Sequence, residues 1–164
     1  MKALFLARLQ PLHLGHLHAI KQAMKKFDKV VIAIGSSNKQ NTLENPFSFE
    51  EREEMIRMCF GEFGIVGLED KESDEEWCEE LMKKANFDVV ISGSEWVREC
   101  ISNVKKVIPP ELLIPEIYNG TNIREKMARG EKWEDLVPEK VARYIKKIRG
   151  EERLKRLRSQ ASIE

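Results

Sequence analysis

Short apolar runs alternate along the chain with longer stretches in which apolar residues recur at helical spacing. The runs at residues 3–6, 30–34, 65–68 and 87–91 are almost entirely apolar. Such runs are typical of strands that are buried on both faces of a parallel sheet. Residues 107–114 contain a further edge strand, which Pro109 and Pro110 interrupt. The pattern therefore predicts a sheet of about five strands.

The segments between the runs carry helix signals. Ser48 with Glu51 forms a capping box that opens one helix, and Ser73 with Glu76 repeats the pattern for the next. Gly64 is expected to end the first of these two helices, and Met24 and Met82 are expected on buried helix faces. We expect helices over about residues 16–27, 48–63, 73–85 and 95–101, then from 120 to Gly130, from Pro138 to about 148, and from Gly150 to about 158.

Alternating strands and helices predict one α/β domain over residues 1–164: a Rossmann-like, doubly wound parallel sheet flanked by helices, with a C-terminal helical segment. We expect residues 1–117 to form the α/β core, residues 118–158 the C-terminal helices, and residues 159–164 a frayed tail. The chain shows no internal repeat and no linker that would divide it.

Composition excludes several classes of function. The 164 residues include 28 basic and 28 acidic side chains, so no overall charge attracts nucleic acid or an anionic membrane. Three widely spaced cysteines indicate neither a disulfide framework nor a zinc site. The apolar N-terminal run is too short for a signal peptide, and no segment is long enough to span a membrane. We expect a cytoplasmic protein without nucleic-acid or membrane partners.

The loop after the first strand carries the strongest chemical signal. Arg8 ends the strand, and His13 and His16 bracket Gly15 where a helix begins. A helix start presents free N–H groups and a positive dipole end, so it already attracts anions. Histidine can donate to phosphoryl oxygens, and we expect Gly15 to leave room for a phosphate. The loop therefore predicts a phosphate site.

Other strands end in similar loops. Residues 35–37 follow the second strand and residues 92–94 follow the fourth, each with glycine and serine. Ligands of open parallel sheets bind outside the carboxyl ends of the strands, at the point where strand order reverses. We therefore expect the three loops to meet there. A second helix start, at residues 120–124, carries Arg124 in its first turn.

Two segments resemble signatures of a known superfamily. Residues 10–16, Gln-Pro-Leu-His-Leu-Gly-His, resemble the H-x-G-H signature of the nucleotidyltransferases, and residues 120–124, Gly-Thr-Asn-Ile-Arg, resemble its second signature. Within that superfamily the chain resembles the archaeal nicotinamide-nucleotide adenylyltransferases. Residues 35–36, 42–47, 51–52, 77, 92–93, 130–138 and 145–154 carry this resemblance.

The resemblance implies transfer of AMP from ATP to nicotinamide mononucleotide, which gives NAD and pyrophosphate. It also implies Mg²⁺ held mainly by the ATP phosphates, and a homo-oligomer, specifically a hexamer. The residues that it implies as catalytic are His13, His16, Arg8 and Arg124. It implies ATP contacts at Leu9, Gln10, Gly15, Ser92, Gly93, Gly120, Thr121 and Asn122, the last three through backbone N–H groups. It implies mononucleotide contacts at Ser36, on the phosphate, at Asp74, and at Trp77, on the nicotinamide ring.

The chain departs from the family pattern at a few positions. Ala7 replaces a glycine, and Glu44 stands where arginine or lysine is common. Asp74 and Ser94 replace asparagines of the expected nicotinamide and adenosine neighbourhoods. Because an aspartate replaces an amide that would contact a carboxamide, we hypothesise that Asp74 favours a different mononucleotide.

Two alternatives stay open. The first is a nucleotidyltransferase with another acceptor, such as nicotinate mononucleotide, flavin mononucleotide or a phosphopantetheine; the regions of Trp77 and Trp133 argue against it. The second is a nucleotide-binding regulator without turnover. The presence of both histidines and of Arg8 and Arg124 argues against that reading, because a protein that only binds nucleotide has no need of groups that stabilise a transition state.

Overall fold

A five-stranded parallel sheet forms the centre of the protein, which a computed structural model describes over residues 1–163. The strand order is β3-β2-β1-β4-β5, so the order reverses between β1 and β4. This confirms the predicted Rossmann-like sheet of about five strands. The strands are β1 (Lys2–Ala7), β2 (Lys29–Ile34), β3 (Gly64–Gly67), β4 (Val89–Ile91) and β5 (Lys106–Ile108).

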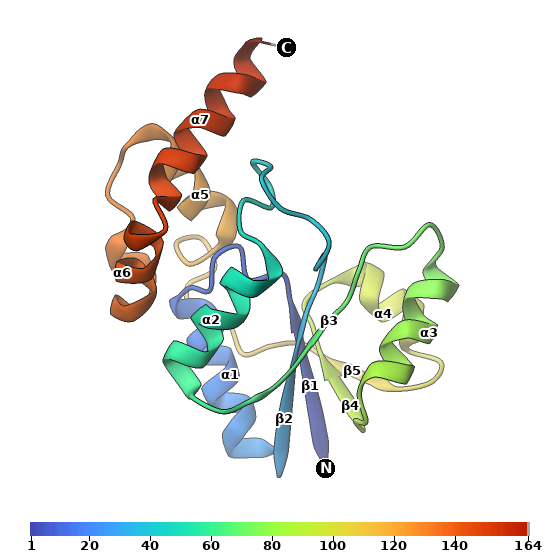
Figure 1. Cartoon of the computed structure of the whole chain (residues 1–164). Coiled ribbons are helices and arrows are strands. Elements are labelled where there is room, and N and C mark those ends of the chain that lie inside the picture. The colour runs from blue at the N-terminus through green and yellow to red at the C-terminus, as the bar shows by residue number, and fades with distance from the viewer. Residues whose placement is uncertain (164) are drawn as a thin grey trace.

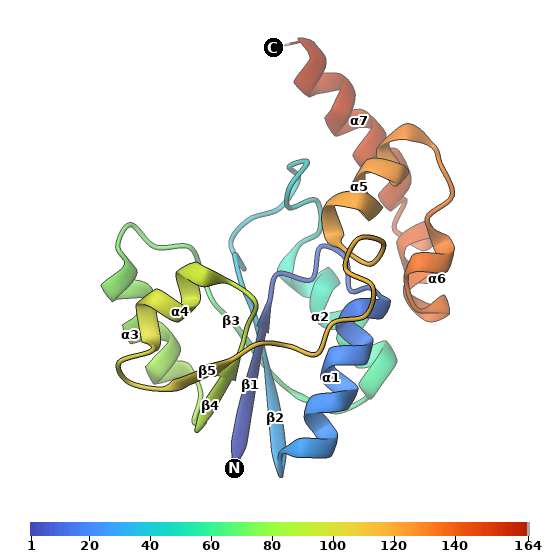
Figure 2. The same cartoon turned by 180° about the vertical axis from the view of Figure 1, so that it is seen from behind.

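Helices cover both faces of the sheet (Figures 1 and 2). On one face, Ala3 and Phe5 of β1 pack in a core cluster with apolar residues of α1 and α2. On the other face, Leu4 of β1 packs with Trp77 of α3 and Val97 of α4. Side chains of successive strand residues point to opposite faces, so the apolar run of β1 serves both layers. The four helices are α1 (Leu14–Lys26), α2 (Phe49–Phe60), α3 (Asp74–Lys84) and α4 (Glu95–Ile101).

The C-terminal segment begins near the carboxyl ends of the strands, and its last helix extends beyond them, opposite the N-terminus (Figure 1). It comprises α5 (Gly120–Arg129), a short 3₁₀ helix (Glu134–Leu136), α6 (Glu139–Lys147) and α7 (Gly150–Ile163). Arg153 of α7 forms a bidentate ion pair with Glu51 of α2, at 2.7 and 2.8 Å, which fixes α7 to the core. The helix runs to Ile163, so residues 159–163 are helical where we expected a frayed tail, and residue 164 lies outside the described residues.

Two other expectations were wrong. The helix α2 ends at Phe60 because Gly61 adopts a backbone conformation (φ 71°, ψ −137°) that disfavours side chains, whereas Gly64 starts β3. Met24 and Met82 are 48% and 37% exposed. Each lies at the edge of the apolar stripe of its helix, where the stripe reaches solvent.

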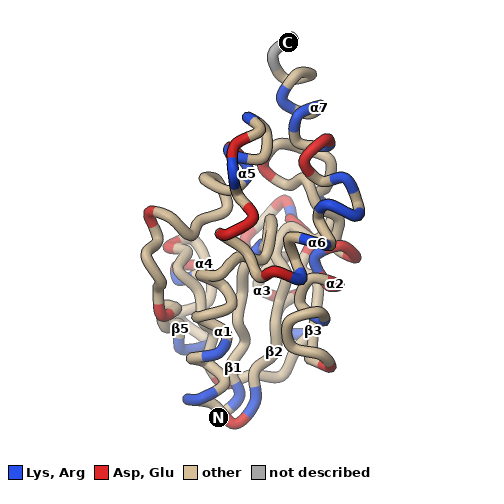
Figure 3. The backbone as a smooth tube through the Cα atoms, turned by 90° about the vertical axis from the view of Figure 1, so that its left-hand side faces the viewer, with Lys and Arg blue, Asp and Glu red and all other residues tan. Residues whose placement is uncertain are grey.

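Basic and acidic residues are interspersed along the chain (Figure 3). Among the described residues, no helix combines the length and apolar character that a membrane crossing requires.

Replacing Gly61 by alanine tests how α2 ends. Alanine must adopt a conformation that costs roughly 1–3 kcal/mol, so Gly61→Ala is expected to lower the free energy of unfolding by that amount. In Gly64→Ala the new Cβ lies 3.5 Å from Val31, an ordinary contact, and the loss is expected to stay within about 0.5 kcal/mol. Urea unfolding of both variants measures the difference, and equal losses would contradict this assignment.

Candidate active site

The two histidines of the first loop cap the helix that they precede. The Nδ1 atom of His13 accepts hydrogen bonds from the backbone N–H groups of Gly15 (3.0 Å) and His16 (3.3 Å). In return, Nδ1 of His16 accepts from the backbone N–H of His13 (3.2 Å). The two rings stack with their centroids 3.6 Å apart. The arrangement is a capping box made of imidazoles instead of serine and glutamate.

This capping box fixes the protonation state of both rings. A nitrogen that accepts a hydrogen bond carries no proton, so each neutral ring holds its proton on Nε2. Burial lowers the pKa of His13 to about 4, and the charge of Arg124 acts in the same direction. Burial, and then the nearby His13, hold the pKa of His16 well below its usual range. Both rings are neutral Nε2–H donors near pH 7.

Gly15 lies against the ring of the capping His13. A Cβ at this position would lie 2.8 Å from Cε1 of His13 and 3.3 Å from Cβ of Tyr118. The space is filled by the His13 ring that folds back onto the helix start. The glycine therefore makes room for the cap, and it also lines a cavity together with His13 and His16.

Arg124 connects the two sequence signatures. Its guanidinium donates to the backbone carbonyl of Gln10 (2.8 Å) and lies 3.4 Å from Oγ1 of Thr121. A Cβ on Gly120 would lie 2.5 Å from this guanidinium, so a larger residue there would displace the guanidinium from its present position. Burial lowers the pKa of Arg124 to about 10, the charge of Arg8 adds to this, and the guanidinium stays protonated at pH 7.

The start of α5 offers fewer free donors than expected. The side chain of Asn119 accepts from the backbone N–H of Asn122 (2.8 Å). The amide of Asn122 itself donates to the carbonyl of Ile117 (3.0 Å). Among the predicted backbone donors, those of Gly120 and Thr121 are the two that the cap leaves for a ligand.

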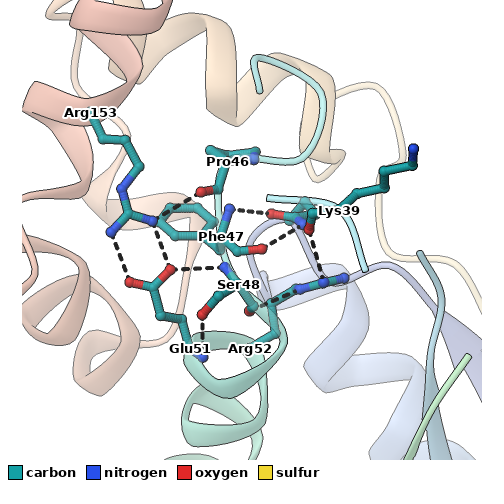
Figure 4. Close-up of polar contacts among 8 residues, drawn as sticks. Lys39, Pro46, Phe47, Ser48, Glu51, Arg52 and Arg153 are labelled. Carbon is teal, nitrogen blue, oxygen red and sulfur yellow. Dashed lines mark hydrogen bonds and ion pairs between the residues drawn. The ribbon is translucent and has the colours of Figure 1, made fainter. Parts of the chain in front are cut away.

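A buried arginine holds the loops after β1 and β2 together. The guanidinium of Arg52 donates to the carbonyl oxygens of Arg8 (3.0 Å) and Gly35 (2.9 Å). Further hydrogen bonds go to the carbonyl oxygens of Ser48 and Lys39 (Figure 4) and to that of Ser36. Burial lowers the pKa of Arg52 to about 10, so the group remains charged. Leu9 and Ser36, which follow two of these carbonyls, have positive φ angles of 57° and 48°.

Three cavities lie in a row around the end of β1. The first, of about 210 Å³, contains His13, His16, Ser92 and Gly93 among its lining residues. The second, of about 300 Å³, shares Leu6 and Ala7 with the first and is also lined by residues that follow β2, β3 and β4. The third, of about 460 Å³, shares Arg8 with the second and includes Thr121 and Arg124. The cavities are therefore adjacent, in the order first, second, third.

Comparison with known proteins decides the family. The cytidylyltransferase-like family matches residues 4–150. The chain belongs to this family. A nicotinamide-nucleotide adenylyltransferase of Methanococcus vannielii is 40% identical over 164 residues, which cover 96% of this chain and 95% of that protein. A protein of the same description from Pyrococcus furiosus is 37% identical over 168 residues, covering 95% and 88%.

The solved structures agree with the fold of this cytidylyltransferase-like protein. A bifunctional NMN adenylyltransferase/ADP ribose pyrophosphatase from Francisella tularensis, solved with AMP and a manganese ion, superimposes with a TM-score of 0.81 at 25% identity. The match covers 99% of this chain and 53% of that one, so this chain spans about half of the bifunctional protein.

The predicted site residues of this family member divide among the cavities. Ser92 and Gly93 line the first cavity, Ser36 and Trp77 the second, and Arg8 both the second and the third. The Ser36 hydroxyl already donates to the carboxylate of Asp70 (2.8 Å). The side chains of Leu9 and Gln10, two predicted ATP contacts, line none of the three cavities. Leu9 lies in the core, and the buried amide of Gln10 pairs with the backbone of Phe47.

Asp74 lies outside the second cavity. It lines a neighbouring surface hollow with Cys78 and Cys100, and its carboxylate accepts from the indole N–H of Trp96 (3.0 Å). The structure thus gives it a protein partner that the sequence did not indicate.

Sequence reasoning missed three residues of the site: Arg52, Asp70 and Trp96. Arg52 lies three and four positions before Met55 and Ile56, within an apolar helix stripe, and a charge in such a stripe is itself a signal. Asp70 follows β3, so the strand-end argument applies to it as it does to Ser36. Trp96 directly follows the loop after β4 and could have been included by the same argument.

A metal has few protein ligands here. Within the described part of the chain, no three His, Cys, Asp or Glu side chains are grouped closely enough to hold an ion. The third cavity contains Glu44 and Glu125 beside its arginines.

The lowered pKa of His13 makes stability depend on pH. Below pH 6.5 the unfolded chain binds a proton at this ring that the folded protein does not bind until about pH 4. The stability that this ring contributes is therefore fully present above pH 6.5 and falls toward pH 4, by about 3 kcal/mol. His13→Asn keeps an oxygen that can cap the helix and removes the titrating ring. We expect urea unfolding of this variant to depend less on pH between 6.5 and 4.

His18→Asn is the matched control, because His18 is half-buried and lies outside the capping box. A pH dependence that is lost in His13→Asn and kept in His18→Asn is assigned to the ring of the capping box. A His13→Asn variant that keeps the full loss of stability would contradict the assignment.

Proposed function

We propose that the protein transfers AMP from ATP to nicotinamide mononucleotide, giving NAD and pyrophosphate. The observation that carries the proposal is a junction of neighbouring cavities, of which the first and second share Ala7 and the second and third share Arg8, because the reaction must bring together an adenosine, a second nucleotide and a leaving pyrophosphate. The names of the relatives that match over nearly the whole chain support the same reaction.

Each cavity suits one part of the reactants. The first, between the histidines and the loop after β4, takes the adenosine. The third, which contains Arg8, Arg124, Arg129 and Arg158, takes the β- and γ-phosphates. The second takes the acceptor, whose phosphate faces Arg8. The α-phosphate then lies at the junction, with the attacking oxygen on one side and the leaving pyrophosphate on the other.

The histidines act in this proposal as hydrogen-bond donors. Each Nδ1 is occupied by a backbone N–H, so the outward Nε2 carries the proton and has no free lone pair with which to attack phosphorus. Donation from Nε2–H to the α-phosphate stabilises the negative charge of the transition state, with His16 closest to the transferred group. No covalent enzyme intermediate is needed.

The permanent charges come from the arginines. Arg8 lines two cavities, and its charge contributes to the lowered pKa of both Arg124 and Arg52. We assign the N–H groups of Gly120 and Thr121 to the triphosphate, at the start of α5. Mg²⁺ enters with ATP as part of the substrate and neutralises charge on the leaving pyrophosphate.

We also propose a homo-oligomer, and specifically a hexamer, as the resemblance in sequence implies. The segment between β5 and α5 supports association because it exposes Leu112, Ile114 and Ile117, at 65%, 52% and 43%.

Substituting His16 tests the proposal. The purified protein is expected to form NAD and pyrophosphate from ATP, Mg²⁺ and nicotinamide mononucleotide. His16→Ala should lower kcat by roughly 100-fold or more, because it removes a donor to the developing charge. His18→Ala is the control and should keep the full rate.

Circular dichroism and the unfolding midpoint show whether each variant is folded. A folded His16→Ala protein with unchanged kcat would refute the role of this ring. Absence of dinucleotide with the unmodified protein would refute the function.

A further inference from the structure

The third cavity is a groove between α5 and α7 that extends away from the junction. Its α5 side is a single helix face, formed by residues 121, 124, 125, 128 and 129, and its α7 side is formed by residues 154 and 158. From Thr121 to Arg129 the α5 face covers about 12 Å along the helix axis. A pyrophosphate group that leaves from the junction is shorter than this, so the groove continues past it.

The four arginines of the groove form an inner and an outer pair. Arg8 follows β1 and Arg124 lies near the start of α5, so both are next to the junction. Arg129 is the last residue of α5, and Arg158 lies one helical turn beyond the buried Leu154 of α7. Both outer arginines are exposed. The outer part of the groove therefore has its own two guanidinium groups.

The two helices that carry the outer pair are fixed to each other and to the core. They pack side by side (Figures 1 and 2). A Cβ on Gly130, directly after α5, would lie 3.7 Å from Cε of Lys155 of α7. Besides its ion pair with Glu51, Arg153 donates to the carbonyl oxygen of Pro46 (2.9 Å), in the loop that closes the groove. The outer pair thus belongs to a preformed groove.

The charge of the groove favours an anion with several phosphate groups. Its lining contains two carboxylates, Glu44 and Glu125, against the four guanidinium groups. The charges of both carboxylates act on Arg124, which places them beside the inner pair. A guanidinium binds phosphate oxygens through two parallel hydrogen bonds, and its charge persists at any physiological pH. A phosphate chain that extends along the groove therefore meets the outer pair after the inner one.

We propose that the outer part of this groove, at Arg129 and Arg158, binds one further phosphate group of a linear phosphate chain. The inference rests on the proposed function, in which the inner pair, Arg8 and Arg124, holds the β- and γ-phosphates. The ligands of this class are inorganic tripolyphosphate and the nucleoside tetraphosphates that contain it.

Adenosine tetraphosphate then serves as a second donor of AMP. A phosphate oxygen of the acceptor forms a bond to the α-phosphorus. The bond from this phosphorus to the oxygen that bridges it to the β-phosphorus breaks, and its electron pair leaves with tripolyphosphate. No group is oxidised or reduced, and the products are the dinucleotide and tripolyphosphate.

Calorimetric titration with two inorganic anions tests the groove without any turnover. The protein is titrated with pyrophosphate and with tripolyphosphate at the same free Mg²⁺ concentration. The unmodified protein is expected to bind tripolyphosphate at least roughly tenfold more tightly, because one charge-assisted hydrogen bond is worth that much. In the double variant Arg129→Ala/Arg158→Ala this ratio of dissociation constants should fall toward one.

Two further variants separate a local contact from the general charge of the protein. Arg156→Ala is the matched control, because Arg156 is exposed on the same helix and lies outside the lining of the groove. It removes one positive charge and should keep the ratio of the unmodified protein. Arg158→Lys keeps the charge and loses the paired hydrogen bonds, so it should keep more of the ratio than Arg158→Ala.

Turnover tests the second donor. With nicotinamide mononucleotide and adenosine tetraphosphate, the unmodified protein is expected to form NAD and tripolyphosphate, both identified by ³¹P NMR. The double variant should lower kcat/KM for the tetraphosphate by a larger factor than kcat/KM for ATP.

Three results would overturn the inference while the proposed function stands. The first is equal affinity of the unmodified protein for the two anions, and the second is an equal loss of affinity for both in the double variant. The third is formation of NAD from ATP but not from the tetraphosphate. If ATP itself yields no dinucleotide, the proposed function is refuted, and the titrations still decide whether the outer arginines bind a phosphate group.

Discussion

The buried guanidinium of Arg52 is the constraint on which the site depends. A charge in the core is costly unless it is hydrogen-bonded, and here the hydrogen bonds go to five backbone carbonyl oxygens. Two of these carbonyls belong to Arg8 and Gly35, at the carboxyl ends of adjacent strands. The strained backbone at Leu9 and Ser36 is held by the same contacts, so the junction of the cavities is preformed.

The site contains two kinds of hydrogen-bond donor, neutral histidines and charged arginines. The histidines are kept neutral by burial and by a cap that uses their Nδ1 atoms, whereas the arginines stay charged even where burial lowers their pKa to about 10. In the proposed reaction, the neutral donors stabilise charge that develops at the transferred phosphate, and the permanent charges hold the phosphates that are already ionised. The geometry thus favours direct transfer between two nucleotides over a covalent intermediate.

Sequence reasoning predicted the features that follow from the periodicity of apolar residues and from the position of polar residues at strand ends. It placed all five strands, the seven helices to within a few residues, and the loops that meet at the reversal of strand order. It assigned the end of α2 to Gly64 and not to Gly61, because either glycine suits a helix end and only the backbone angles distinguish them. Contacts between distant segments could not be predicted from the sequence. The hydrogen bond of Trp96 with Asp74 and the contacts of Arg52 depend on how the helices and loops pack.

The central claim is that AMP passes directly from ATP to the acceptor at this junction. The stereochemical course at the α-phosphorus tests it most directly. The protein is given ATP that carries sulfur in one defined configuration at the α-phosphate, and the configuration of the resulting dinucleotide is determined by ³¹P NMR. A single in-line displacement predicts inversion. Retention would show two displacements, and so a nucleotide bound covalently to the enzyme, which would contradict the assignment of the histidines as neutral donors.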